Sequence, residues 1–262
     1  MSLLIDLQRY PLDQPGSGAW QALVEHSRQA LRAHGMFNLE GFVRAEVIAE
    51  AARQLEPAMR GESHTHSRTH NIYFKPQIDG LPGDHPALRR VETVSHTLCA
   101  DQLQSSLVTQ VYEYPPLLVF LAAVMDKPAL HLMADPLARV NVMSYREGET
   151  LNWHFDRSEF TTTLMLQAPD QGGEFQYRTD LRSDNDPNYA GVAELLEGRD
   201  AHVRTLRLQA GTLNVFRGKN TAHRVTPVRG ARERMVAVFS YYERPGVLFS
   251  AEEQLGFYGR TA

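Results

Sequence analysis

The feature that most constrains the fold is a change in the residue pattern of the sequence at about residue 138. Beyond it, short runs rich in β-branched and aromatic residues are separated by turn signals such as Gly148, Gln171–Gly173 and Gly211. Many short strands with such punctuation are typical of a β-sandwich or barrel. We therefore predict a double-stranded β-helix (jelly-roll) core over about residues 138–245. The expected strands are Arg139–Tyr145, Phe160–Leu166, Glu174–Tyr177, Val203–Leu208, Thr212–Phe216 and Met235–Tyr242.

The first part of the chain, about residues 1–135, has a helical pattern instead. Apolar residues recur at helical spacing over Trp20–Leu31 and Val47–Met59, and Gly35 follows the first run as a stop signal. A third helix is expected over Leu117–Met125, because Pro115 and Pro116 precede it and proline is tolerated in the first turn of a helix. The expected fold class is therefore mainly β with N-terminal helices (α+β), as a single domain over residues 1–262.

One long polar stretch, Thr179–Asp200, separates two of the expected strands and contains a short helix-like piece, Val192–Leu196. Insertions of this length are often lids or binding loops. A solvent-exposed surface loop without a function is an equal alternative.

Composition limits the class of partner. A formal net charge of −4 offers no basic surplus for nucleic acid or an anionic membrane. The longest apolar run, Leu117–Met125, is far shorter than the ~20 residues that span a bilayer. The first residues lack the pattern of a signal peptide, and the lone cysteine, Cys99, suits a reducing compartment, although a periplasmic protein without disulfides would have the same cysteine content. We therefore expect a cytoplasmic protein that binds a small molecule, and the sequence carries no signal for its oligomeric state.

The stretch LNWHFD, residues 151–156, raises the question of a metal site. On a strand, His154 and Asp156 would point to the same face. Such a pair arises by chance in about half of chains like this one, so a surface strand is a real alternative. With His223 from a distant strand, the three residues would form the facial triad of non-haem iron oxygenases, which leaves three coordination positions open.

Arg234 follows His223 by eleven residues and heads an apolar strand. A buried guanidinium is costly unless it is paired, and a carboxylate would satisfy it with two hydrogen bonds. An exposed arginine beside Arg232 and Glu233 is the alternative.

Together these pieces resemble the Fe(II)/2-oxoglutarate-dependent dioxygenase superfamily. The resemblance implies Fe(II) held by His154, Asp156 and His223, with 2-oxoglutarate and O2 as cosubstrates. It further implies that Arg234 grips the distal carboxylate of 2-oxoglutarate, with Tyr145 as a second donor. The motifs that carry it are Tyr145–Gly148, His154–Asp156, Gly172–Phe175, Gly211–Phe216, His223–Val225 and Arg234.

Two segments, Asn152–Phe160 and Val238–Glu243, resemble a bacterial group of free amino acid halogenases and hydroxylases that includes lysine halogenases. This likeness implies a small free amino acid substrate, most simply lysine or another cationic one. In such halogenases a small residue replaces the carboxylate ligand and opens a position for halide. Asp156 would fill that position here, which favours hydroxylation. A halogenase and a non-catalytic sensor of metal and carboxylate remain alternatives.

Candidates for substrate contacts come from two places. The run His64–His70 contains three histidines, but it is polar and lacks helix or strand periodicity, so we expect a loop over the pocket mouth rather than a metal site. Within or beside it, Arg68, His70 and Asn71 are candidates to contact a substrate carboxylate. Ser240 would share the inward strand face with Arg234 and approach the substrate or the cosubstrate.

Overall fold

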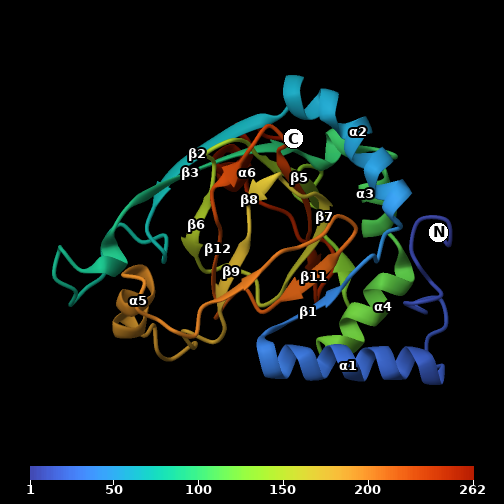
Figure 1. Ribbon diagram of the computed structural model, residues 1–262, viewed down its shortest axis with the longest axis horizontal. Coiled ribbons are helices and arrows are strands. Elements are labelled where there is room, and N and C mark those ends of the chain that lie inside the picture. Colours follow the sequence, from blue (N-terminus) through green and yellow to red (C-terminus); the bar gives the residue numbers. More distant parts are fainter.

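The computed structural model describes residues 1–262, and its core consists of two antiparallel sheets that pack face to face (Figure 1). The larger sheet has the strand order β1 (Met36–Leu39), β11 (Leu213–Phe216), β7 (Thr161–Gln167), β14 (Arg234–Phe239), β5 (Val140–Tyr145), β3 (Val91–Leu98) and β2 (His64–His70). The smaller has the order β10 (Arg204–Leu206), β9 (Phe175–Arg178), β12 (Ala222–Val225) and β6 (Leu151–His154). Two short ribbons pair β13 (Val228–Arg229) with β8 (Gln171–Gly172) and β15 (Tyr241–Tyr242) with β4 (His131–Leu132).

Four helices cover the outer face of the larger sheet: α1 (Gly18–His34), α2 (Ala45–Gly61), α3 (Leu107–Tyr112) and α4 (Pro115–Val124). Helix α1 ends where expected, because Gly35 adopts the left-handed conformation at φ 72°. The other helices are α5 (Tyr189–Leu196) and α6 (Ala251–Tyr258), with short 3-10 turns at Pro86–Leu88 and Ala100–Leu103. None of these helices combines the length and the apolar character needed to cross a membrane.

The alternation of side chains along the strands builds two cores. On β7, Leu164 and Leu166 pack against the helices, whereas Met165 faces the smaller sheet. There Met165 joins Phe216 of the larger sheet and Phe175 of the smaller one. Period-two alternation thus fills both sides of the larger sheet, as in a jelly roll. The predicted fold class is confirmed.

The N-terminal part is less helical than the sequence suggests. It contributes three strands, β1, β2 and β3, to the larger sheet. The expectation of a loop over His64–His70 is wrong, since these residues form the edge strand β2 and pair with β3 along their whole length. An edge strand needs no continuous apolar face, so its polar residues hide the strand periodicity.

The Thr179–Asp200 insertion lies between β9 and β10 and contains α5, close to the predicted helical piece. It packs against the segment 71–90 at the side of the molecule where β2 and β3 project (Figure 1). Their shared apolar cluster is separate from the main core and covers Phe155, the residue between His154 and Asp156. The cluster contains Ile72, Ala87, Phe155, Leu181, Val192, Leu195 and Ala222.

Candidate metal centre

Two strands of the smaller sheet bring the three predicted ligands together. His154 ends β6 and lies directly opposite His223 of β12. The ligand atoms of His154, Asp156 and His223 all lie within 4.8 Å of one another. The Nε2 atoms of His154 and His223 lie 3.3 and 3.4 Å from the carboxylate oxygens of Asp156. Asp156 lies just beyond the end of the strand, where its backbone N–H donates to the Gly218 carbonyl at 3.1 Å.

The backbone fixes how both imidazoles present themselves. His154 Nδ1 lies 2.8 Å from the Asn152 carbonyl oxygen, and His223 Nδ1 lies 3.0 Å from that of Thr221. A carbonyl oxygen only accepts, so each Nδ1 carries the hydrogen and donates it. The Nε2 atom of each ring therefore faces Asp156, which is how metal-binding histidines are usually oriented.

The electrostatics of the group favour a cation. Burial lowers the pKa of the His154 imidazole, and the neighbouring His223 lowers it further. Burial would raise the pKa of Asp156, but His223 and His154 outweigh it and hold the carboxyl well below its usual range. Burial likewise opposes the charge on His223, yet Asp156 raises the pKa of that imidazole. The carboxylate is thus anionic and attracts positive charge, which a divalent metal ion with two nitrogen ligands supplies.

Two residues that the sequence did not reveal hold Asp156 in place. The Thr161 hydroxyl donates to Asp156 Oδ2 at 2.6 Å. Gly218 lies against the same oxygen, and a Cβ atom at position 218 would stand only 2.2 Å from it. Gly218 opens the run that leads to His223 and could have been noticed, whereas nothing in the sequence links Thr161 to the carboxylate.

A second feature of the site is an arginine without a counter-ion. Arg234 is 3% exposed, and its Nε donates to the Gly173 carbonyl at 3.1 Å. Its guanidinium makes no ion pair and no other hydrogen bond within the protein. Burial lowers the pKa of Arg234 to about 10, so it stays charged at neutral pH. A buried unpaired guanidinium fits a carboxylate ligand and excludes the alternative of an exposed arginine.

Tyr145 accompanies this arginine. It is the direct cross-strand partner of Arg234, whose guanidinium carbon lies 5.8 Å from the centre of the tyrosine ring. Burial raises the pKa of Tyr145 to about 12, so its hydroxyl keeps its hydrogen and can donate it. The pair therefore offers a cation and a neutral donor from adjacent strands.

Arg68 and His70 lie near the metal ligands, and Phe74 connects them. His70 is buried, and its ring nitrogens lie 3.0 Å from the Asn71 carbonyl oxygen and 3.0 Å from Thr93 Oγ1. The His70 ring stacks on Phe74, whose ring in turn meets His154 edge-on at 6.1 Å. Arg68 is exposed, without an ion pair, and its guanidinium carbon lies 4.7 Å from the centre of the Phe74 ring.

Asn71 and Ser240 are engaged locally. The Asn71 carboxamide accepts from the backbone N–H groups of Tyr73 and Lys75, so it holds its own turn. The Ser240 hydroxyl donates to the Ala138 carbonyl at 3.1 Å. Ser240 follows the end of β14 opposite Arg234, roughly 20 Å along the strand at the usual rise per residue. It therefore does not share a carboxylate ligand with Arg234.

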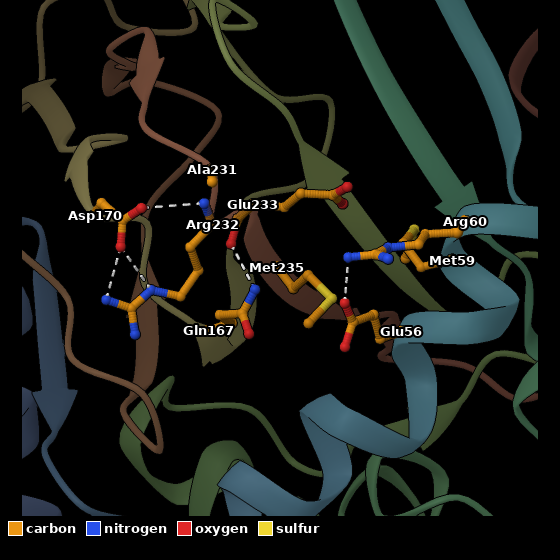
Figure 2. A pocket seen from close by; sticks show the side chains of 9 residues that line it. All are labelled: Glu56, Met59, Arg60, Gln167, Asp170, Ala231, Arg232, Glu233 and Met235. Atoms are coloured by element: carbon orange, nitrogen blue, oxygen red, sulfur yellow. Dashed lines mark hydrogen bonds and ion pairs between the residues drawn. The ribbon is translucent and has the colours of Figure 1, made fainter.

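A cavity of about 340 Å³ lies elsewhere, between α2 and the outer face of the larger sheet (Figure 2). Its charged groups are already paired: Glu56 with Arg60, and Asp170 with Arg232. Glu233 likewise pairs with Arg146, which does not line the cavity. Because no charge is left for a ligand, this cavity does not compete with the metal centre as a candidate site.

A jelly roll that carries a His-Asp-His group opposite a buried arginine has the architecture of a non-haem iron oxygenase. The sequence model of the Halogenase D (HalD) family matches residues 19–248. The chain therefore belongs to the Halogenase D family. No curated protein matches it.

Solved structures show the same fold at low sequence identity. An oxidoreductase of the 2OG-Fe(II) oxygenase family from Burkholderia pseudomallei is 16% identical, with 89% of this chain and 94% of that chain covered and a TM-score of 0.51. HygX from Streptomyces hygroscopicus, with nickel, 2-oxoglutarate and hygromycin B bound, is 12% identical, with coverages of 90% and 96% and a TM-score of 0.54. A Trichoplax adhaerens prolyl hydroxylase, in complex with a hypoxia inducible factor peptide fragment, is 12% identical, with coverages of 87% and 94% and a TM-score of 0.52.

Proposed function

We propose that the chain is an Fe(II)- and 2-oxoglutarate-dependent hydroxylase that acts on an unactivated C–H bond of a small free amino acid. One observation carries the proposal: a complete His-Asp-His group lies in the same barrel as a buried arginine that has no carboxylate partner. The first fits Fe(II), and the second fits the distal carboxylate of 2-oxoglutarate. HygX, which shares the fold, binds a metal together with 2-oxoglutarate.

The residues of the chain would act by binding and orientation. His154, Asp156 and His223 would hold the iron through three ligands and leave the remaining positions to 2-oxoglutarate and O2. Arg234 and Tyr145 would hold the far carboxylate of the cosubstrate by charge-assisted hydrogen bonds. Iron with these two cosubstrates supplies the oxidation of a C–H bond, so no acid or base from the protein is required.

Asp156 favours hydroxylation within a family that is named for halogenation. Thr161 and Gly218 form a cradle that fits its carboxylate, which would occupy the position that halide takes in the resembling halogenases. A halogenase is nevertheless the second candidate, because the match to the Halogenase D family model covers residues 19–248.

The proposed substrate carries a carboxylate. Arg68 is an exposed arginine without an ion pair, and it lies on Phe74 next to His154. An α-carboxylate on Arg68 would bring the side chain of an amino acid toward the metal. We propose lysine or another cationic amino acid, with His70, whose ring stacks on Phe74, as a further residue of the site. Proteins of this fold bind ligands that range from hygromycin B to a peptide, so the size of the substrate must be tested.

The experiment is a screen for product and succinate. Anaerobically purified protein receives Fe(II), 2-oxoglutarate, ascorbate and chloride, and is exposed to air with a panel of free amino acids. We expect one amino acid to gain one oxygen atom with matching succinate, and both signals to vanish in His154→Ala. Chlorine in the product would make the enzyme a halogenase. Metal binding without succinate would contradict the proposed amino acid substrate and favour a larger substrate or the sensor.

A further inference from the structure

Phe74 stands at the junction of the metal site and the unpaired arginine. Its ring stacks on His70 at a centroid distance of 4.4 Å and meets the ring of His154 edge-on at 6.1 Å. The Arg68 guanidinium carbon lies 4.7 Å from the centre of the same ring. One aromatic side chain therefore contacts an exposed cation and a metal ligand at once.

The backbone at this position is strained. Phe74 has φ 55°, in the left-handed region that bulky residues rarely adopt. Asn71 maintains the conformation, since its carboxamide and its carbonyl accept backbone hydrogen bonds from Tyr73, Phe74 and Lys75. Strain that is enforced by its surroundings is found most often at functional sites.

The strain does not serve to bury the side chain. Phe74 is 36% exposed, although the neighbouring Tyr73 packs into the apolar cluster beneath the insertion. The turn thus anchors one aromatic residue and presents the next at the rim of the metal site. A glycine or asparagine would adopt this conformation more easily. The backbone conformation therefore does not explain the phenylalanine, and we infer that its aromatic ring has a role.

We propose that Phe74 is a specificity-determining residue. Its ring holds the Arg68 guanidinium beside the metal centre by a cation–π contact, and its exposed part forms an apolar wall for the aliphatic portion of the substrate. The ligand class is a small aliphatic carboxylate. The inference rests on the proposed function, which supplies the substrate, and adds the residue that aligns it.

The test measures binding rather than turnover. The anaerobic protein with Fe(II) and 2-oxoglutarate is titrated with L-lysine and with cadaverine, the same chain without its carboxylate. The visible absorption of the iron complex reports binding. Phe74→Asn removes the ring but tolerates the backbone conformation, and Phe74→Leu keeps an apolar group but offers no cation–π contact. Val119→Asn is the control, because Val119 is 49% exposed on α4, on the outer face of the larger sheet.

We expect Phe74→Asn to weaken L-lysine binding by about tenfold or more, and to weaken cadaverine binding less. Phe74→Leu should fall between the wild type and Phe74→Asn. The melting temperature should not fall in any variant, and the affinities for Fe(II) and 2-oxoglutarate should stay unchanged. Val119→Asn should behave as the wild type.

Three different results would overturn the inference. Unchanged L-lysine binding in Phe74→Asn, beside a wild type that binds, would remove the role of Phe74 and leave the proposed function intact. A wild type that binds neither probe would contradict the proposed amino acid substrate, and the inference would fail with it. A lowered melting temperature together with lost iron binding would make Phe74 a packing residue.

Discussion

Arg234 and Tyr145 face each other as the first residue of β14 and the last residue of β5, and both side chains are buried. The arginine has no acidic partner in the protein, and the tyrosine hydroxyl is a neutral donor beside it. A pair of this kind is satisfied by an anion from outside. In the proposed enzyme that anion is the distal carboxylate of 2-oxoglutarate.

This pair gives the first prediction. Arg234→Gln should weaken 2-oxoglutarate binding by about tenfold to a hundredfold, because a hydrogen bond to a charged group contributes ~1.5–3 kcal/mol. Tyr145→Phe should weaken it less, by up to about tenfold, since its donor is neutral. Isothermal titration of the Fe(II) protein checks both affinities. Metal affinity should not change in either variant, and a loss of metal binding would show that the pair has another role.

Thr161 gives the second prediction. Its hydroxyl donates to Asp156 Oδ2, so Thr161→Val removes the donor that orients the carboxylate while keeping the shape of the side chain. We expect metal affinity to fall by about tenfold to a hundredfold, as is usual for residues that support a ligand. Thr161→Ser restores the hydroxyl and should restore the affinity. Equal affinities in Thr161→Val and the wild type would contradict the cradle around Asp156.

Gly218 gives the third prediction. In Gly218→Ala the new methyl group would lie 2.2 Å from Asp156 Oδ2 and 2.8 Å from Thr161 Oγ1, so the carboxylate must move. We expect the rise in melting temperature that a bound metal gives to the wild type to shrink or vanish. Gly61→Ala is the matched control, because no atom lies within 4 Å of a Cβ atom there. A full metal-induced rise in Gly218→Ala would show that Asp156 is not held as described.

Cys99 gives a prediction about reactivity. Burial raises the pKa of its thiol to about 11, so the nucleophilic thiolate makes up only about one part in a thousand at pH 8. The native protein should therefore resist alkylation by iodoacetamide, and the labelled fraction should grow as the pH approaches 11. The unfolded protein should be labelled rapidly at pH 8. Rapid labelling of the native protein at that pH would mean that the segment around Cys99 opens readily.

Most elements that pack into the core could be predicted from the sequence. Helices α1 and α2 follow apolar periodicity, helix α4 begins at two prolines, and the strands β5, β7, β11 and β14 are runs of β-branched and apolar residues between turn signals. Strand β2 could not be predicted in the same way. Its polar side chains show no such periodicity, and only pairing with β3 reveals it as a strand.

The same contrast applies to the site. The ligands His154, Asp156 and His223 could be predicted because their chemistry is distinctive and two of them stand two residues apart. Thr161 and Phe74 could not, since their contacts are created only by the fold, and for Gly218 the one signal was its place at the start of the run that leads to His223. Asn71 was expected to meet the substrate, but its side chain is used in the turn that presents Phe74.

The most direct test of the central claim is the fate of isotopically labelled O2 in a single reaction. The protein is supplied with Fe(II), 2-oxoglutarate, chloride and the amino acid found in the screen. The masses of succinate and of the modified amino acid are then measured by mass spectrometry. A hydroxylase of this kind places one labelled oxygen atom in the amino acid and the other in succinate. Labelled succinate beside a chlorinated amino acid would contradict the role given to Asp156, and the absence of label from both products would contradict the oxygenase itself.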